Sequence, residues 1–270
     1  MRLIYARYRM GLPIKGIDDF VRKESASLET ATHNYGHFKR VADGAVWFVR
    51  VLGGGAREQQ LACIAGLLHD IVRPADERVD HAVASAERSR RILQRFKFSR
   101  EDTDAIVEAI HDHRLQPAKW KSPLHQSVYL ADKIFEQMGA YLIFRRCMYV
   151  AESVTYKGVP MKEAINRHFA MRIERIPKDA FPKRFSGLVN YQYEWLTNAQ
   201  KALSENRAWA WDIAKVSYEN GRSHGKGLEE LILTFEPSHP EAARVKAEAV
   251  EYLEGRKLKF FESLVLYSSY

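Results

Sequence analysis

Apolar residues recur along most of the chain at the i, i+3, i+4 spacing of one helix face. The pattern predicts helices over about 27–52, 57–71, 80–96, 99–113 and 123–138, with helical pattern resuming to about 156, and then over about 160–176, 186–220 and 239–254. Glycine and proline clusters separate these stretches. The last stretch, 259–270, is rich in Phe, Leu, Val and Tyr and leaves one β-type segment open. We therefore expect an all-α or mainly α protein.

The loop Lys157-Gly158-Val159-Pro160 is the clearest interruption in the helical pattern. Its position predicts an N-terminal arm over 1–26, a helical core over 27–156 and a helical C-terminal extension over 157–270. A chain of 270 residues fits one large domain or a core with an appendage.

Composition indicates an ordinary globular protein, with 46% hydrophobic and 28% charged residues. No run approaches the ~18 apolar residues of a transmembrane helix. Arginines scattered through the first nine residues argue against a signal peptide. Two cysteines, Cys63 and Cys147, imply neither a disulfide framework nor a zinc-thiolate site. We expect a cytoplasmic protein that does not associate with membranes.

The net charge of +8 favours anionic ligands such as nucleotides, phosphates or nucleic acid, although excess Lys and Arg can equally serve only to solubilise a helical surface. Aromatic residues interleaved with basic ones in the C-terminal half could stack on single-stranded nucleic acid. Their helical spacing favours packing between helices instead, and dimerisation through this half is a further option. These residues are Tyr191, Tyr193, Trp195, Trp209 and Trp211.

The pair His69-Asp70 stands at the end of an otherwise apolar helical run that includes Leu67, Leu68 and Ile71. Burying two such groups without partners costs roughly 2–7 kcal/mol each. The pair therefore predicts either a hydrogen-bond network or a metal ion at this point of the core.

Histidines are concentrated in the first half of the chain, where seven of the ten lie. His33 and His37 are four residues apart, the spacing of one helix face. His113 follows the inner face of its helix, whereas His111 projects about 160° away. Asp132 is an acid within an apolar run. We expect four other histidines to lie at the surface, namely His125, His168, His224 and His239.

Three of these segments, in order, resemble the HD-domain superfamily of metal-dependent phosphohydrolases. They are H-x-x-R-V at His37, L-L-H-D-I at His69-Asp70 and A-D-K-I at Asp132, and the resemblance covers about residues 27–150. It implies a helical bundle in which His37, His69, Asp70 and Asp132 hold one divalent metal ion. Members with two metals add a histidine that opens the next helix and another on the helix after it. His81 and His113 resemble these two, and Asp70 would then bridge both ions.

The resemblance implies hydrolysis of a phosphomonoester or phosphodiester by metal-activated water. The substrate would be a nucleotide or another small phosphorylated molecule, and the metal would be Mn, Fe, Ni, Co, Zn or Mg. Asp70 and Lys133 are the candidate catalytic residues. Asp70 could orient the water or accept its proton, and Lys133, which directly follows a ligand, could neutralise charge on the substrate. We expect the substrate to contact residues beside the ligands and on the following helix, namely Arg40, Arg73, His33 and Arg145. For Arg40 a structural ion pair is an equal alternative.

Two alternatives remain open at this stage. One is a helical RNA- or protein-binding module that keeps an HD-like core without catalysis. The other is an HD oxygenase, which would use the six-ligand version of the site for two iron ions.

Overall fold

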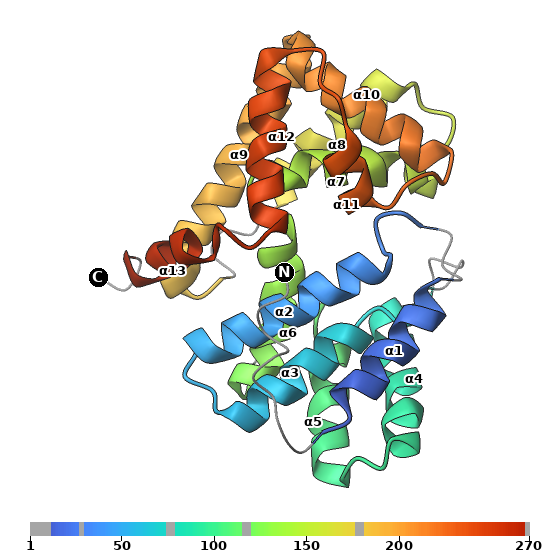
Figure 1. The fold of residues 1–270 in the computed structure, drawn as a ribbon, viewed down its shortest axis with the longest axis vertical. Helices are drawn as coiled ribbons and strands as arrows, with labels where there is room; N and C mark the ends of the chain where they lie inside the picture. Colours follow the sequence, from blue (N-terminus) through green and yellow to red (C-terminus); the bar gives the residue numbers. More distant parts are fainter. Residues whose placement is uncertain (1–11, 27–29, 74–78, 115–119, 176–180, 268–270) are drawn as a thin grey trace. The chain divides into compact units, whose positions relative to one another are not determined.

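The computed structural model describes residues 12–26, 30–73, 79–114, 120–175 and 181–267. These residues form thirteen α-helices and short 3₁₀ turns with no strand among them, which confirms the all-α expectation (Figure 1). None of the described helices is long and apolar enough to cross a membrane. The chain divides into two compact units, which we describe separately.

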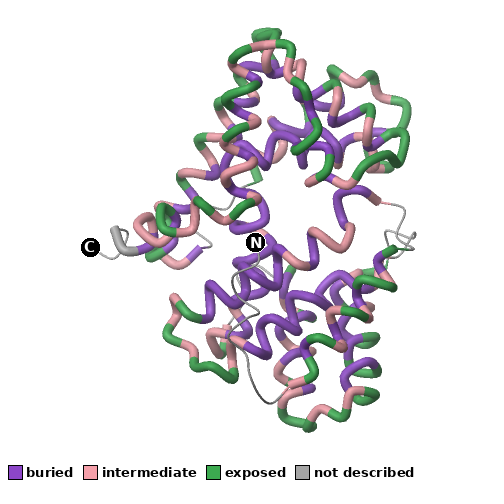
Figure 2. The backbone as a smooth tube through the Cα atoms, viewed as in Figure 1, coloured by how far each residue is buried: buried purple, intermediate pink, exposed green. Residues whose placement is uncertain are grey.

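The N-terminal unit contains described residues 12–26 and 33–136. Its central helix is α2, which is buried along most of its length and packs against α3 and α6 (Figure 2). The neighbouring helices α1 and α5 pack on α3, and α4 packs on α5. The helices are α1 (Ile14–Ser25), α2 (Tyr35–Val51), α3 (Ala56–Leu68), α4 (His81–Arg95), α5 (Arg100–His111) and α6 (Pro123–Lys133).

Gly66 allows α2 and α3 to approach each other closely. A Cβ atom at this position would lie 2.5 Å from the Cα atom of Ala42 on α2. Such a distance is far inside van der Waals contact, so any side chain at Gly66 would push the two helices apart. Because Gly66 lies one turn before His69-Asp70, this close packing brings the end of α3 against the start of α2.

The C-terminal unit contains residues 30–32 and 137–267 of the described chain. In it α7 packs on α10 and α8, and α9 packs on α8 and α13. Its helices are α7 (Tyr141–Glu152), α8 (Met161–Arg175), α9 (Ser186–Ser204), α10 (Ala208–Arg222), α11 (Leu228–Thr234), α12 (Pro240–Leu253) and α13 (Leu258–Tyr267).

Some local expectations need correction. The segment left open to β-structure is helix α13, whose apolar residues Phe261 and Val265 recur at helical spacing and are buried. The single helix expected over 186–220 is two helices, because Asn206 adopts a positive φ of 54° between α9 and α10. The two compact units divide the chain between residues 136 and 137.

The predicted N-terminal arm also contains ordered structure. Helix α1 buries Ile14, Ile17 and Val21 at helical spacing, and it packs on α3. Gly16 is a contact position within this helix, since a Cβ atom there would lie 2.7 Å from the ring of Phe96. Residues 1–11 lie outside the described part of the chain.

Candidate metal centre

The first two predicted ligand segments meet where α2 begins and α3 ends. His37 lies in the first turn of α2, where its backbone N–H donates to the side-chain oxygen of the N-cap Asn34 at 3.2 Å. Helix α3 ends at Leu68, so His69 and Asp70 project from the turn that follows it. All three ligand candidates are buried.

Three further candidates come from α4, α5 and α6. His81 is the first residue of α4, whose N-cap Asp80 accepts a hydrogen bond from a backbone N–H of the first turn. His113 lies in the turn after α5 and is fully buried, whereas the side chain of His111 is 50% exposed. The choice of His113 over His111 is thus confirmed as the inward-facing residue. Asp132 occupies the last turn of α6 and is buried.

The carboxylate of Asp70 lies between two pairs of histidines. Its Oδ2 atom is 3.7 Å from both His37 Nε2 and His69 Nε2. Its Oδ1 atom is 3.4 Å from His81 Nε2 and 3.7 Å from His113 Nε2. Each oxygen thus faces its own pair of imidazole nitrogens, which is the arrangement of a carboxylate that can bridge two ions.

Hydrogen bonds to the main chain define which nitrogen of two rings carries the proton. His69 Nδ1–H donates to the Gly66 carbonyl at 2.8 Å, and His113 Nδ1–H donates to the Ile110 carbonyl at 2.6 Å. A neutral ring protonated on Nδ1 has its lone pair on Nε2. The Nε2 lone pair of His69 is directed at His37 Nε2, 3.2 Å away. Ligand atoms of His37, His69 and Asp132 all lie within 4.8 Å of one another.

Electrostatics keep the two acids ionised despite their burial. Burial alone would raise the pKa of Asp70, but the nearby His69 and Arg73 outweigh it and hold that pKa well below its usual range. Burial likewise opposes ionisation of Asp132, and the Lys133 ammonium leads the charges that lower its pKa. Both carboxylates are therefore available as anionic ligands at neutral pH.

His81 and His113, which face Asp70 Oδ1, stay neutral because burial disfavours the protonated, charged imidazole. Burial lowers the pKa of His81 to about 4 and that of His113 to about 3, and the charge of Asp70 offsets only part of this. Burial also lowers the pKa of His69. Neutral imidazoles next to ionised carboxylates are the protonation states that bind a divalent cation.

Comparison with known families agrees with this geometry. The family model described as HD domain matches residues 34–135. Residues 34–135 form an HD domain. HD domains belong to a superfamily of metal-dependent phosphohydrolases, and the matched segment includes all six candidate ligands.

Among solved structures, the chain resembles the crystal structure of Bacillus subtilis YpgQ in complex with ADP. The two share 20% sequence identity and superpose with a TM-score of 0.53, and the match covers 72% of this chain and 97% of YpgQ. At this identity the likeness shows a shared fold. The search of curated proteins found no match.

Two predicted cationic residues lie at the edge of the site in the HD domain. Arg73 Nη1 is 3.1 Å from Asp70 Oδ2, and the Lys133 ammonium pairs with Asp132. Their side chains are 27% and 29% exposed, so both reach solvent as well as a ligand carboxylate.

Two more of the predicted substrate contacts, His33 and Arg145, differ in their surroundings. His33 lies before α2 and not on it, is 8% exposed, and packs its ring edge-on against that of His37 at 5.1 Å. Arg145 belongs to α7 in the C-terminal unit, where it is buried.

Arg40 forms an ion pair, which is one of the two roles that its sequence position left open. Its guanidinium makes two hydrogen bonds, of 2.8 and 2.9 Å, to the carboxylate of Glu136 inside the N-terminal unit. Glu136 Oε1 is also 3.1 Å from His37 Nδ1. Sequence reasoning missed Glu136, although it is an acid within an apolar run four residues after Asp132, the signal that singled out Asp132 itself.

A further group with the chemistry of metal ligands consists of Glu108, Asp112 and His125. His125 Nδ1 accepts the backbone N–H of Lys121 at 3.2 Å, so the neutral ring carries its proton on Nε2. That Nε2–H donates to Asp112 at 2.8 Å, and Lys121 pairs with Glu108. Since no nitrogen lone pair is left for a metal, this group is a hydrogen-bonded structural cluster.

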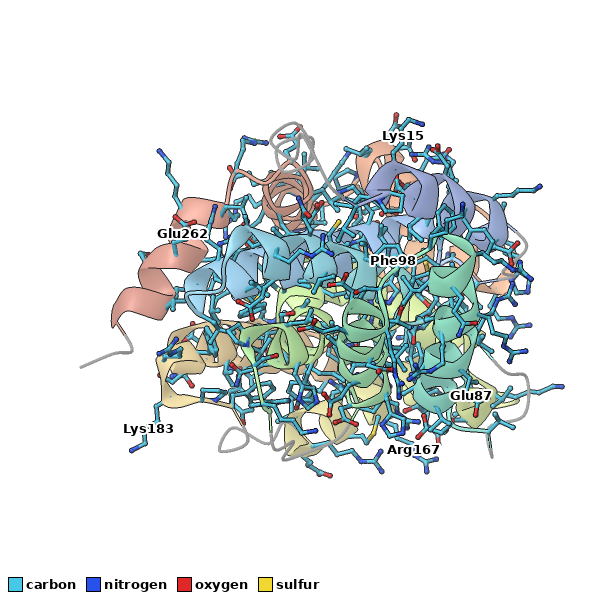
Figure 3. All side chains as sticks on the ribbon, turned by 90° about the horizontal axis from the view of Figure 1, so that it is seen from below. Lys15, Glu87, Phe98, Arg167, Lys183 and Glu262 are labelled. Carbon is cyan, nitrogen blue, oxygen red and sulfur yellow. The ribbon has the colours of Figure 1, made fainter. Side chains whose placement is uncertain are left out.

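The expectation that four histidines lie at the surface is half wrong. His125 is 3% exposed and His168 is 1% exposed. His168 lies on the inner face of α8, whereas its neighbour Arg167 is exposed (Figure 3). His224 is exposed and His239 is half-buried.

Proposed function

We propose that the HD domain binds divalent metal ions and hydrolyses a phosphate ester of a nucleotide or a similar small molecule. The observation that carries this proposal is a group of buried electron-pair donors that face one another. His69 Nε2 presents a lone pair to His37 Nε2 at 3.2 Å, and an Asp70 oxygen lies 3.7 Å from each. Without a cation between them such groups repel, and a metal ion converts that repulsion into coordination.

The residues fit a metal on two further counts. Asp70 Oδ1 and His113 Nε2 are buried and make no hydrogen bond within the described residues. Mixed imidazole and carboxylate donors suit Mn, Fe, Co, Ni or Zn. We assign His37, His69, Asp70 and Asp132 to a first ion, and Asp70, His81 and His113 to a second.

When bound, such an ion supplies a water molecule of lowered pKa and stabilises charge on phosphoryl oxygens. The protein's own contribution is to hold Asp70 ionised between the two histidine pairs and to place cations around them. Arg73 and Lys133 lie at the edge of the site and are partly exposed, so their charges can neutralise phosphoryl oxygens of a substrate. His33, beside His37, is the third group we assign to substrate contact.

A nucleotide is the substrate class we favour. The chain carries a net charge of +8, which attracts polyanions. The structure of YpgQ with which it shares its fold holds ADP. Arg40 is not among the phosphate contacts we propose, because Glu136 takes up its guanidinium.

The test is metal analysis of the purified chain together with phosphatase and phosphodiesterase assays in Mn²⁺, Co²⁺ or Ni²⁺. The substrates are nucleoside mono-, di- and triphosphates, cyclic dinucleotides and generic phosphate esters. We expect bound metal and an activity that Asp70→Ala abolishes. Asp112→Asn, in the structural cluster with His125, is the matched control and should retain it.

The proposal fails if none of these metals binds or if Asp70→Ala leaves the activity intact. A reaction that consumes dioxygen and requires iron would replace it with the oxygenase alternative, because the same two histidine pairs around Asp70 could hold two iron ions.

A further inference from the structure

Glu136 is a fully buried carboxylate that contacts two residues of α2. Its two oxygens accept hydrogen bonds from Arg40 at 2.8 and 2.9 Å. Oε1 also lies 3.1 Å from His37 Nδ1. Asp70 faces the other ring nitrogen of His37, Nε2. Arg40 and Glu136 therefore lie on the side of the His37 ring opposite to Asp70.

The neighbouring residue anchors this carboxylate against α2. Phe135 packs on Gly44, where a Cβ atom would lie 2.8 Å from the phenylalanine ring. The ring of Phe135 also contacts Trp47 on the same helix. Glu136 is thus held in place by packing as well as by Arg40.

The three buried histidines among the candidate ligands differ in the group that faces their Nδ1 atom. In His69 and His113 the partner is a main-chain carbonyl, which accepts a proton and never donates one. In His37 the group facing Nδ1 is the side chain of Glu136, whose Oε1 lies 3.1 Å away without the alignment of a hydrogen bond. His37 is therefore the one of these three whose Nδ1 faces another side chain.

The tautomer of His37 matters because of the His69 ring. With its proton on Nδ1, facing Glu136, His37 keeps a lone pair on Nε2 for a metal. With its proton on Nε2, it would donate to His69 Nε2 across the 3.2 Å that separates them. That hydrogen bond would engage the lone pair of His69 Nε2 and leave no lone pair on His37 Nε2, so neither ring could bind the first ion.

We propose that Glu136, held by Arg40, is a positioning residue that keeps the proton of His37 on Nδ1 and so keeps the first metal group open. The inference rests on the proposed metal site. Carboxylates behind metal-bound histidines commonly act in this way, and their removal typically costs 10–100-fold in metal affinity. A purely structural Arg40–Glu136 ion pair is the competing explanation.

The first measurement is Co²⁺ titration of the full chain, followed by its absorption spectrum, for wild type and Glu136→Gln. We expect the dissociation constant of the variant to rise about 10–100-fold. Nitrogen-15 NMR of the histidine rings without metal should show His37 protonated on Nδ1 in wild type and shifting toward Nε2 in the variant. An unchanged His37 tautomer together with unchanged affinity would overturn the proposal.

A double variant separates positioning from stability. Arg40→Met with Glu136→Met removes both members of the ion pair, so no buried charge is left unpaired. We expect its thermal unfolding without metal to recover toward wild type while the Co²⁺ dissociation constant stays about 10-fold or more above it. If affinity recovers together with stability, the role of Glu136 is structural and the proposal is wrong.

Asp43→Asn is the matched control, because Asp43 is another buried carboxylate in an ion pair, with Lys39, and lies on α2 itself. It should leave the Co²⁺ affinity within about threefold of wild type. An equal loss of affinity in this variant would contradict a specific role for Glu136. If the wild type binds no Co²⁺ at all, the proposed function falls, and the His37 tautomer still decides the role of Glu136.

Discussion

Both units of this chain contain buried histidines, but the charged groups around those histidines are opposite in sign. In the N-terminal unit the buried rings face carboxylates, and Asp70 alone lies within 3.7 Å of four imidazole nitrogens. In the C-terminal unit His168 accepts or donates a hydrogen bond with the Tyr156 hydroxyl at 3.1 Å. The charges that act on His168 are those of arginines.

The two sites show that a buried histidine does not by itself indicate a metal. Burial, together with Arg146, Arg172 and Arg145, lowers the pKa of His168 to about 2. Its Nε2 atom is buried and makes no hydrogen bond within the described residues, as is true of His113 Nε2. A cation placed beside His168 would meet like charges, whereas one beside His113 would meet Asp70. The carboxylates therefore decide which site can hold a metal.

The largest expected effect comes from removing the carboxylate on which the comparison depends. Asp70→Asn should lower metal-dependent hydrolysis by more than about 100-fold, beyond the usual loss for residues behind the ligands. Steady-state kinetics with the best substrate from the screen measures this. His168→Gln should leave the rate within about threefold, since nothing around His168 attracts a cation. Equal losses in both variants would remove the distinction between the two sites.

Metal binding should stabilise the folded chain. For an ion that binds only the folded state, a free concentration of 100 times the dissociation constant adds about 2.7 kcal/mol to the free energy of unfolding. Urea unfolding with and without Mn²⁺ tests this, with hydrogen exchange to locate the gain. We expect protection to increase at α2 and α6, which carry ligands, and at α3, which the ligands His69 and Asp70 directly follow, and α12 to be unaffected. Gains confined to the C-terminal unit would contradict our assignment of the ligands.

The two units each contain a glycine at a close helix contact, which allows a matched test. Gly66→Ala would place a Cβ atom 2.5 Å from Ala42, and Gly221→Ala would place one 2.8 Å from the Met148 carbonyl. Overpacking of this kind costs about 1–3 kcal/mol in each variant. Only Gly66→Ala should also weaken Co²⁺ binding, because it separates the helices that carry His37 and His69. Loss of affinity in both would show that general destabilisation is the cause.

The smallest expected effect is a difference in pH dependence. The pKa of His168 is lowered from 6.5 to about 2, so between these values the unfolded chain binds more protons than the folded chain. Stability from this group is therefore full above pH 6.5 and falls as the pH decreases, by about 1.4 kcal/mol per pH unit.

Urea unfolding of the metal-free chain between pH 6.5 and about pH 4.5 measures this contribution. His81 and His113, whose pKa values are lowered to about 4 and about 3, contribute in the same direction and remain in the variant. His168→Gln should reduce the slope of the unfolding free energy against pH by the contribution of one histidine. Parallel curves for wild type and variant would mean that His168 is protonated in the folded chain.

Local chemistry and periodicity were enough to predict much of this protein from its sequence. Apolar spacing predicted most of the helices, and His37, His69-Asp70 and Asp132 stood in segments similar to those of the HD superfamily. Helical geometry favoured His113 over His111, since 3.6 residues per turn sets which side chains share a face, and the resemblance to the HD superfamily pointed to the same residue. These features depend on residues close together in sequence, which is why they could be predicted.

Only the tertiary structure decided which polar groups compensate each other across the chain. Arg40 and Glu136 are far apart in sequence, and only the fold shows that the guanidinium of Arg40 is paired with this carboxylate. The burial of His125 and His168 likewise depends on partners from other helices. Asp70 was predicted as a ligand, but only folding places its two oxygens toward two separate histidine pairs. A sequence pattern specifies a helix face, and packing of that face against others specifies the partners.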